Sequence, residues 1–209
     1  MTRDPLAAPL PRAPIVRLAV IGEGLLFVFA LAWIALRDIE IPLSFSLETL
    51  LLAGAIAAPL AILNLYLFLG PSGPRLCHPA WRVFSERLIQ PLCAALSPGA
   101  ALLVSVMAGV AEETAFRGLL LTELRPHVGS LGAVVVSGIV FGWVHFLGMW
   151  REFFPVLAAY CLFGILLGAI YLMTRDLVLL IVIHTIYDFW VIVAVHRKAA
   201  GGQSHPLSE

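Results

Sequence analysis

Long apolar segments constrain this chain more than any other feature of its sequence. Each is long enough to cross the hydrocarbon core of a bilayer as a helix, which takes roughly 20 residues. With 61% hydrophobic and only 12% charged residues, the chain lies outside the composition of soluble domains. The sequence therefore predicts an all-α, polytopic membrane helical bundle with about six transmembrane helices. The expected spans are residues 16–36, 47–69, 98–121, 131–149, 154–173 and 177–195.

The segments between and beyond the spans predict one membrane domain with two polar ends. Residues 1–14 contain four prolines and two arginines and predict a flexible leader, and residues 197–209 predict a disordered polar tail. A single integral-membrane domain is expected over residues 15–196, with Pro71-Ser72-Gly73-Pro74 ending its second span. Apolar residues recur at helical spacing between Trp81 and Leu92, which predicts an amphipathic interfacial helix; a cytosolic loop helix is the alternative.

Charge distribution predicts the orientation and excludes some partners. Six spans place both termini on one side, where nine basic residues fall, against three on the other. By the positive-inside rule the termini are expected in the cytosol, and the compact chain points to a bacterial inner membrane. The formal net charge is zero, so nothing favours nucleic acid as a partner. Three widely spaced cysteines predict neither a disulfide framework nor a metal site.

A pair of glutamates interrupts the third apolar segment. Glu112 and Glu113 are followed by Arg117, and no other charged residue lies between 98 and 121. A carboxylate at membrane depth costs on the order of 3 kcal/mol unless it has a partner or a function. Glu113 and Arg117, four residues apart, share a helix face and can neutralise each other. Glu112 lies about 100° round the helix and is therefore free for chemistry.

Two further spans carry ionisable groups at helical spacing. Phe141 and His145 share one face of the fourth span, and His184 and Asp188 share one face of the sixth. At about 1.5 Å per residue, Glu112, His145 and His184 are expected within a slab of roughly 10 Å at mid-bilayer. The sequence thus permits a common site. Glu23, alone in the first span, is interpreted as a satisfied buried carboxyl rather than a catalytic one.

Several kinds of chemistry fit these residues. A glutamate and a neutral histidine can share general-base work on a water molecule, and a second histidine with a hydrogen-bonding partner can stabilise an oxyanion. This combination predicts hydrolysis of a peptide or ester inside the membrane. Glu112, His145 and His184 could instead hold Zn²⁺ with an open water position, although the HExxH spacing is absent. The same residues are also compatible with a proton relay in a small transporter, or with a non-catalytic scaffold or immunity-type protein.

The three motifs resemble those of the CAAX protease and bacteriocin-processing (CPBP, Abi-like) family of intramembrane endopeptidases, which includes the type II CAAX prenyl proteases. The family patterns EExxxR, FxxxH and HxxxN/D occur here in order, over about residues 97–195, as Glu112-Glu113-x-x-x-Arg117, Phe141-x-x-x-His145 and His184-x-x-x-Asp188.

The resemblance implies a role for each motif residue. Glu112 is expected to be the catalytic glutamate, and His145 to help it activate water. His184 and the residue at 188 are expected to form the oxyanion site, with Glu113 and Arg117 in support. It also implies a membrane-associated peptide or protein substrate, and it leaves glutamate-type and zinc-dependent mechanisms open. An asparagine at position 188 would be a ready hydrogen-bond donor, whereas the carboxylate of Asp188 cannot donate a hydrogen bond unless it is protonated. We therefore expect Asp188 to orient His184.

Overall fold

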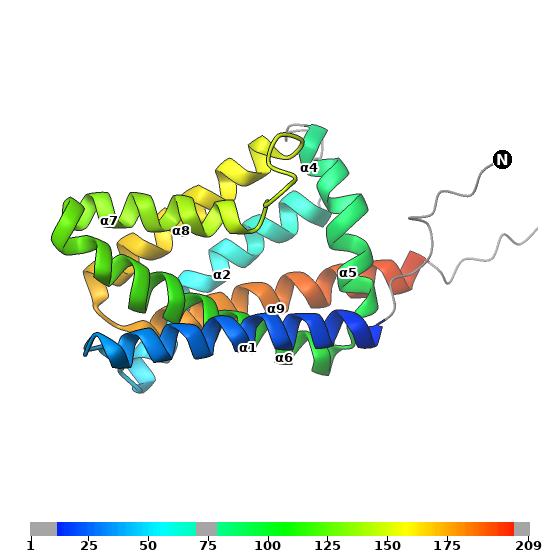
Figure 1. Ribbon diagram of the computed structural model, residues 1–209. Helices are drawn as coiled ribbons and strands as arrows, with labels where there is room; N and C mark the ends of the chain where they lie inside the picture. Colours follow the sequence, from blue (N-terminus) through cyan, green and yellow to red (C-terminus); the bar gives the residue numbers. More distant parts are fainter. Residues whose placement is uncertain (1–11, 70–78, 203–209) are drawn as a thin grey trace, which may run out of the picture.

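The computed structural model describes residues 12–69 and 79–202, and within these ranges the regular elements are all helical. Long helices lie side by side and form a bundle (Figure 1), which confirms the predicted all-α membrane architecture. The elements are α1 (Arg12–Leu36), α2 (Leu47–Leu69), α4 (Pro79–Phe84), η2 (Ser85–Ile89), α5 (Gln90–Ala95), α6 (Pro98–Glu113), η3 (Thr114–Leu121), α7 (Thr122–Val144), α8 (Phe154–Thr174) and α9 (Leu177–Gly202).

One of the apolar helical stretches reverses direction within the membrane domain. Five stretches of the described chain are long and apolar enough to span a membrane, and Pro98–Val144 is 47 residues long. At about 1.5 Å per residue it would reach about 70 Å, twice what a bilayer requires. The chain turns at Gly129, whose φ of 72° and ψ of 171° suit a residue without a side chain. The hydroxyl of Ser137 donates to the carbonyl of Phe116 at 2.9 Å, so the two legs pack together, and the five stretches of the described chain supply six helical legs to the bundle.

Several element boundaries differ from those expected. The third span continues past residue 121 to the turn at Gly129, because the reversal needs a residue that readily adopts a positive φ. The fourth helix ends at Val144 instead of 149, and residues 145–153 form turns. α1 already begins at Arg12, and α9 continues to Gly202. The rest of the expected leader and tail, and the Pro71–Pro74 stop, lie outside the described residues.

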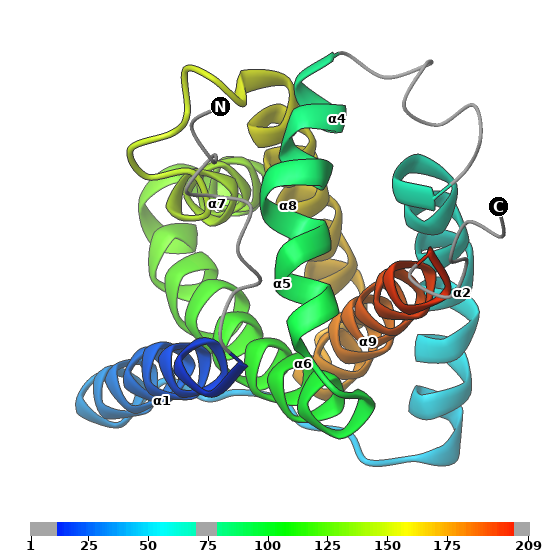
Figure 2. The same cartoon turned by 90° about the vertical axis from the view of Figure 1, so that its right-hand side faces the viewer.

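The predicted amphipathic helix is present as α4, η2 and α5 in succession, and it runs across one end of the bundle (Figure 2). Its Phe84 packs against Phe146 and Phe153, with ring centroids 5.5 and 5.6 Å away. Ser85 is buried, whereas Leu92 is 37% exposed, so the buried stripe is rotated from the expected one. The π-helical η2 explains the rotation, since its wider turn shifts the residues that follow it.

Glycines allow the helices that carry the motifs to approach closely. A Cβ at Gly142 of α7 would lie 2.6 Å from the backbone nitrogen of Cys161 in α8. A Cβ at Gly109 of α6 would lie 2.9 Å from the carbonyl oxygen of Ile181 in α9. Small residues at such crossings are typical of packing in membranes, where van der Waals contact replaces the hydrophobic effect. The backbones of α6 and α9 are therefore close enough for the carboxyl groups of α6 to reach His184.

Candidate active site

Glu113 lies at the centre of a fully enclosed polar cluster. The side chains of Glu113 and Arg117 have no exposed surface, and Glu113 Oε1 accepts hydrogen bonds from Arg117 Nη1 at 2.9 Å and from His184 Nδ1 at 2.7 Å. Arg117 Nη2 also donates to the carbonyl of Gly164 at 3.0 Å, and its guanidinium lies 4.6 Å from the centre of the Phe141 ring. The expected pairing between Glu113 and Arg117 forms, and it also anchors the histidine of α9.

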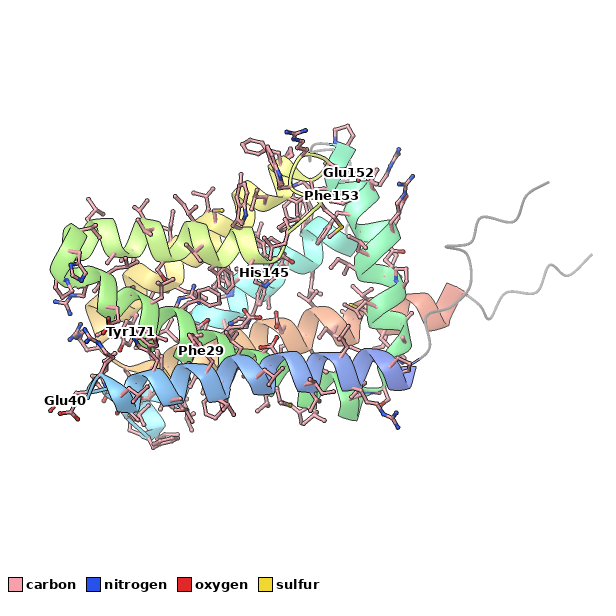
Figure 3. The ribbon with its side chains drawn as sticks, viewed as in Figure 1. Phe29, Glu40, His145, Glu152, Phe153 and Tyr171 are labelled. Atoms are coloured by element: carbon pink, nitrogen blue, oxygen red, sulfur yellow. The ribbon has the colours of Figure 1, made fainter. Side chains whose placement is uncertain are left out.

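Hydrogen bonds to acceptor oxygens define how the two histidines are held. His145 Nδ1 lies 2.7 Å from the carbonyl oxygen of Phe141, and His184 Nδ1 lies 2.7 Å from Glu113 Oε1. Carbonyl and carboxylate oxygens can only accept, so each Nδ1 carries the proton. In both rings Nε2 is therefore the nitrogen turned towards Glu112. His145 terminates α7 rather than lying within a helix as expected, and it faces the interior of the molecule (Figure 3).

Glu112 lies between these two nitrogens without a direct hydrogen bond to either. Its Oε1 is 3.7 Å from His145 Nε2 and its Oε2 is 3.9 Å from His184 Nε2. Both separations exceed a hydrogen bond, and Oε2 is buried with no partner among the described residues. On the other side, Asp188 Oδ2 is 3.4 Å from His184 Nε2. Glu112 is thus the free carboxylate of the pair.

A cavity of about 360 Å³ joins these groups. Glu112, His145, His184 and Asp188 all line it, whereas Glu113 and Arg117 lie behind its wall. The structure thus brings the four residues predicted to be catalytic to one place, although their roles remain predictions. Apolar and aromatic side chains form most of the remaining wall, among them Leu60, Leu63, Trp81, Ile89, Phe141, Tyr160 and Phe163.

Two polar residues of this wall, Asn64 and Tyr187, were not expected there from the sequence. Asn64 is 9% exposed, and it lies on the same buried face of α2 as Ala53 and Ala57. That spacing, with an amide in an otherwise apolar span, is the signal that could have identified it. Tyr187 precedes Asp188, and its ring stacks on Phe163 with a centroid distance of 4.9 Å.

Glu23 lies closer to this group than its isolated position in the sequence indicated. Its Oε2 is buried and has no hydrogen-bond partner among the described residues, and its carboxyl interacts electrostatically with Glu112, His145, His184 and Asp188. It does not line the cavity. The expectation that Glu23 is satisfied by a hydrogen-bonding partner is therefore wrong for Oε2.

Cys93 of α5 also lines the cavity, but its thiol is poorly suited to nucleophilic chemistry. The residue is 2% exposed, and burial raises the pKa of the thiol to about 12. The reactive form of cysteine is the thiolate, which is scarce at neutral pH when the pKa is this high. Among the cavity residues, Glu112 is the stronger candidate for the reacting group.

The arrangement does not match a metal site as it stands. Zinc ligands lie about 2.0–2.2 Å from one ion, so three of them must converge on a single point. Here the two histidines face different oxygens of Glu112, and no group of three or more His, Cys, Asp or Glu side chains in the described chain has the geometry to hold a metal. A zinc site would require these side chains to rearrange.

Comparison with known proteins supports the resemblance carried by the motifs. Residues 94–190 match the family described as type II CAAX prenyl endopeptidase Rce1-like. Neither the curated proteins nor the solved structures yield a match. The matched residues run from α5 into α9 and contain all three motifs, together with the cluster around Glu113. Residues 94–190, a little under half of the chain, are therefore similar to the CAAX-type prenyl endopeptidases, and this similarity supports an intramembrane endopeptidase of the CAAX-protease type.

Proposed function

We propose that this protein hydrolyses a peptide bond of a membrane-associated protein or peptide, with Glu112 and His145 activating the water molecule. The observation that carries the proposal is the free carboxylate of Glu112, which lies 3.7 and 3.9 Å from two imidazole nitrogens in one cavity. Separations of this size suit a small molecule between the groups better than a direct hydrogen bond. A water molecule held there can give its proton to Glu112 or to His145 Nε2.

The reaction balances with these groups alone. The oxygen of the water bonds to the carbonyl carbon, its proton passes to Glu112, and the π electrons of the carbonyl move to oxygen. When the tetrahedral intermediate collapses, the C–N bond breaks, and the departing nitrogen takes the proton from Glu112. The products are a carboxylic acid and an amine.

In this proposal His184 stabilises the negative charge that develops on the carbonyl oxygen, and it does not activate the water. Glu113 fixes the ring through Nδ1 at 2.7 Å and leaves Nε2 facing the cavity, where its protonated form can donate to the oxyanion. The carboxylates of Glu113 and Asp188 flank the ring and compensate its charge. The guanidinium of Arg117 neutralises the carboxylate of Glu113, which would otherwise be an unpaired charge in the membrane interior.

The mostly apolar cavity favours a substrate that is itself embedded in the bilayer. Prenylated CAAX termini, secreted leader peptides and C-terminal sorting tails all fit this description, and in a bacterial inner membrane the last two are the expected classes. The start of α1 and the end of α9 lie at the same end of the bundle (Figure 1), which fits two cytosolic termini.

Cleavage of a membrane-peptide library in liposomes tests the proposal. The wild type is compared with Glu112→Gln, which removes the base, and with Glu40→Gln, a matched change at an exposed carboxyl outside the cavity. We expect Glu112→Gln to lower kcat at least about 100-fold, the range of general-base effects, and Glu40→Gln to leave it unchanged.

Each arm of this experiment is repeated with a strong chelator. Cleavage that depends on Glu112 and survives chelation supports the glutamate mechanism. Cleavage that is lost on chelation and restored by Zn²⁺ makes Glu112, His145 and His184 metal ligands. If the wild type cleaves no peptide of the library while the vesicles conduct protons, the endopeptidase proposal is replaced by that of a proton relay in a small transporter.

A further inference from the structure

The aspartate at position 188 leaves the proposed reaction short of a hydrogen-bond donor. An ionised carboxylate only accepts hydrogen bonds, so beside a developing oxyanion it repels rather than stabilises. Each preorganised donor at such a site contributes about 10²–10³ in kcat. On the wall formed by α9, His184 is then the one remaining donor of the third motif.

Asn64 faces the same cavity from the opposite helix. It is 9% exposed in a span of apolar residues, and its face of α2 packs against α9. Asn64, His184 and Asp188 line one cavity of about 360 Å³ with Glu112. A buried amide of this kind needs hydrogen-bond partners, since an unpaired buried polar group destabilises the fold.

The contacts of Asn64 leave its amide partly unused. Tyr187 lies close enough to Asn64 for the two side chains to interact, and the described residues give the Asn64 amide no hydrogen bond of ordinary geometry. An amide has one acceptor oxygen and two N–H donors, so at least one N–H is left whichever of the two residues donates. Tyr187 stacks on Phe163, which holds the tyrosine ring in place beside the amide of Asn64.

We propose that Asn64 donates an N–H to the oxyanion, supplying from α2 the donor that an asparagine at 188 would supply from α9. When the water oxygen bonds to the carbonyl carbon, the electron pair that moves to the carbonyl oxygen is stabilised by Asn64 together with His184. When the C–N bond breaks, the pair returns and the hydrogen bond weakens. This role rests on the proposed hydrolysis, and it makes α2, which lies outside the matched residues 94–190, part of the catalytic machinery.

The competing explanation is that Asn64 only joins α2 to α9 through Tyr187. A contact between helices in a membrane contributes to their packing, so this role changes stability more than chemistry. The two explanations differ in what Asp188→Asn does. A new donor at 188 can replace a lost oxyanion donor, but it cannot restore a lost contact between Asn64 and Tyr187.

A double-mutant cycle over Asn64→Leu and Asp188→Asn, measured as cleavage in liposomes and melting in detergent, tests the assignment. Tyr66→Phe serves as the matched α2 control, because Tyr66 is 42% exposed and lies outside the cavity wall. We expect Asn64→Leu to lower kcat about 100-fold with little change in KM. Adding Asp188→Asn to that variant should raise its kcat at least tenfold.

The outcomes separate this inference from the proposed function. If Asn64→Leu leaves kcat unchanged while cleavage still depends on Glu112, the hydrolysis stands and the role of Asn64 is overturned. A fall in both kcat and Tm that Asp188→Asn does not restore also overturns it, in favour of the helix contact. If the wild type shows no Glu112-dependent cleavage, both proposals fall together.

Discussion

At the scale of single residues, the distances around His184 indicate what Asp188 contributes. Its Oδ2 lies 3.4 Å from His184 Nε2, whereas Glu113 holds Nδ1 at 2.7 Å, so the ring keeps its main anchor without Asp188. We therefore expect Asp188→Asn to keep kcat within about tenfold of the wild type, since an amide can also hydrogen-bond the ring or donate to the oxyanion. Loss of all cleavage in a protein that still melts normally would contradict an orienting role.

The buried ion pair gives a second expectation at this scale. Arg117→Gln leaves Glu113 charged and fully enclosed, which costs about 3–5 kcal/mol. Arg37→Gln is the matched control: Arg37 pairs with Glu123 at 3.5 Å with its side chain 59% exposed, and such pairs contribute about 0–1 kcal/mol. Thermal melting in detergent should show a large loss for the first variant and almost none for the second. If the loss for Arg117→Gln is as small as that for Arg37→Gln, the Glu113 cluster adds little to stability.

At the scale of elements, the crossing of α6 and α9 determines whether the site assembles. A Cβ at Gly109 would lie 2.7 Å from Thr185 Oγ1 and 2.9 Å from the Ile181 carbonyl, so Gly109→Ala must push the helices apart. Glu113 lies one turn along α6, and we expect its hydrogen bond to His184 to lengthen and kcat to fall at least tenfold, as small misplacements of reacting groups do.

A matched glycine separates this steric effect from helix propensity. A Cβ at Gly54 of α2 would have nothing within 4 Å of it, so Gly54→Ala should be neutral or slightly stabilising. Comparison of cleavage rates and Tm for the two variants measures the close approach itself. Similar behaviour of both variants would mean that α6 can move away from α9 without harm to the site.

At the scale of the whole molecule, the six expected crossings and the positive-inside rule make the orientation testable. Glu40 and Glu152 lie at opposite ends of the bundle (Figure 3) and both are exposed. In a variant without its natural cysteines, we expect Glu40→Cys to react with a membrane-impermeant maleimide in intact cells. Glu152→Cys should react only after permeabilisation. The reverse pattern would invert the orientation, and labelling of both from outside would contradict the six crossings.

Much of the architecture follows from local patterns that act without tertiary context. The apolar runs define the spans because backbone groups in lipid must be satisfied within each helix. The i, i+4 spacing placed Arg117 beside Glu113, and that pair forms even though Arg117 lies in the π-helical η3. A reversal was expected between the spans 98–121 and 131–149, and the structure places it at Gly129. The span boundaries were less predictable, because helix ends depend on contacts such as those of Phe146 in the 145–153 turn.

The sequence by itself determined the membrane bundle, the motif residues and the choice of Glu112 as the free carboxylate, because hydropathy and helical spacing act over a few turns of one helix. Only the tertiary structure decided that Glu113 holds His184 as well as Arg117, that Glu23 lies near the site, and that Asn64 enters the cavity wall. These relations join helices far apart in the chain. They depend on which helix faces meet, and glycine-mediated packing of α6 against α9 and of α7 against α8 sets those faces.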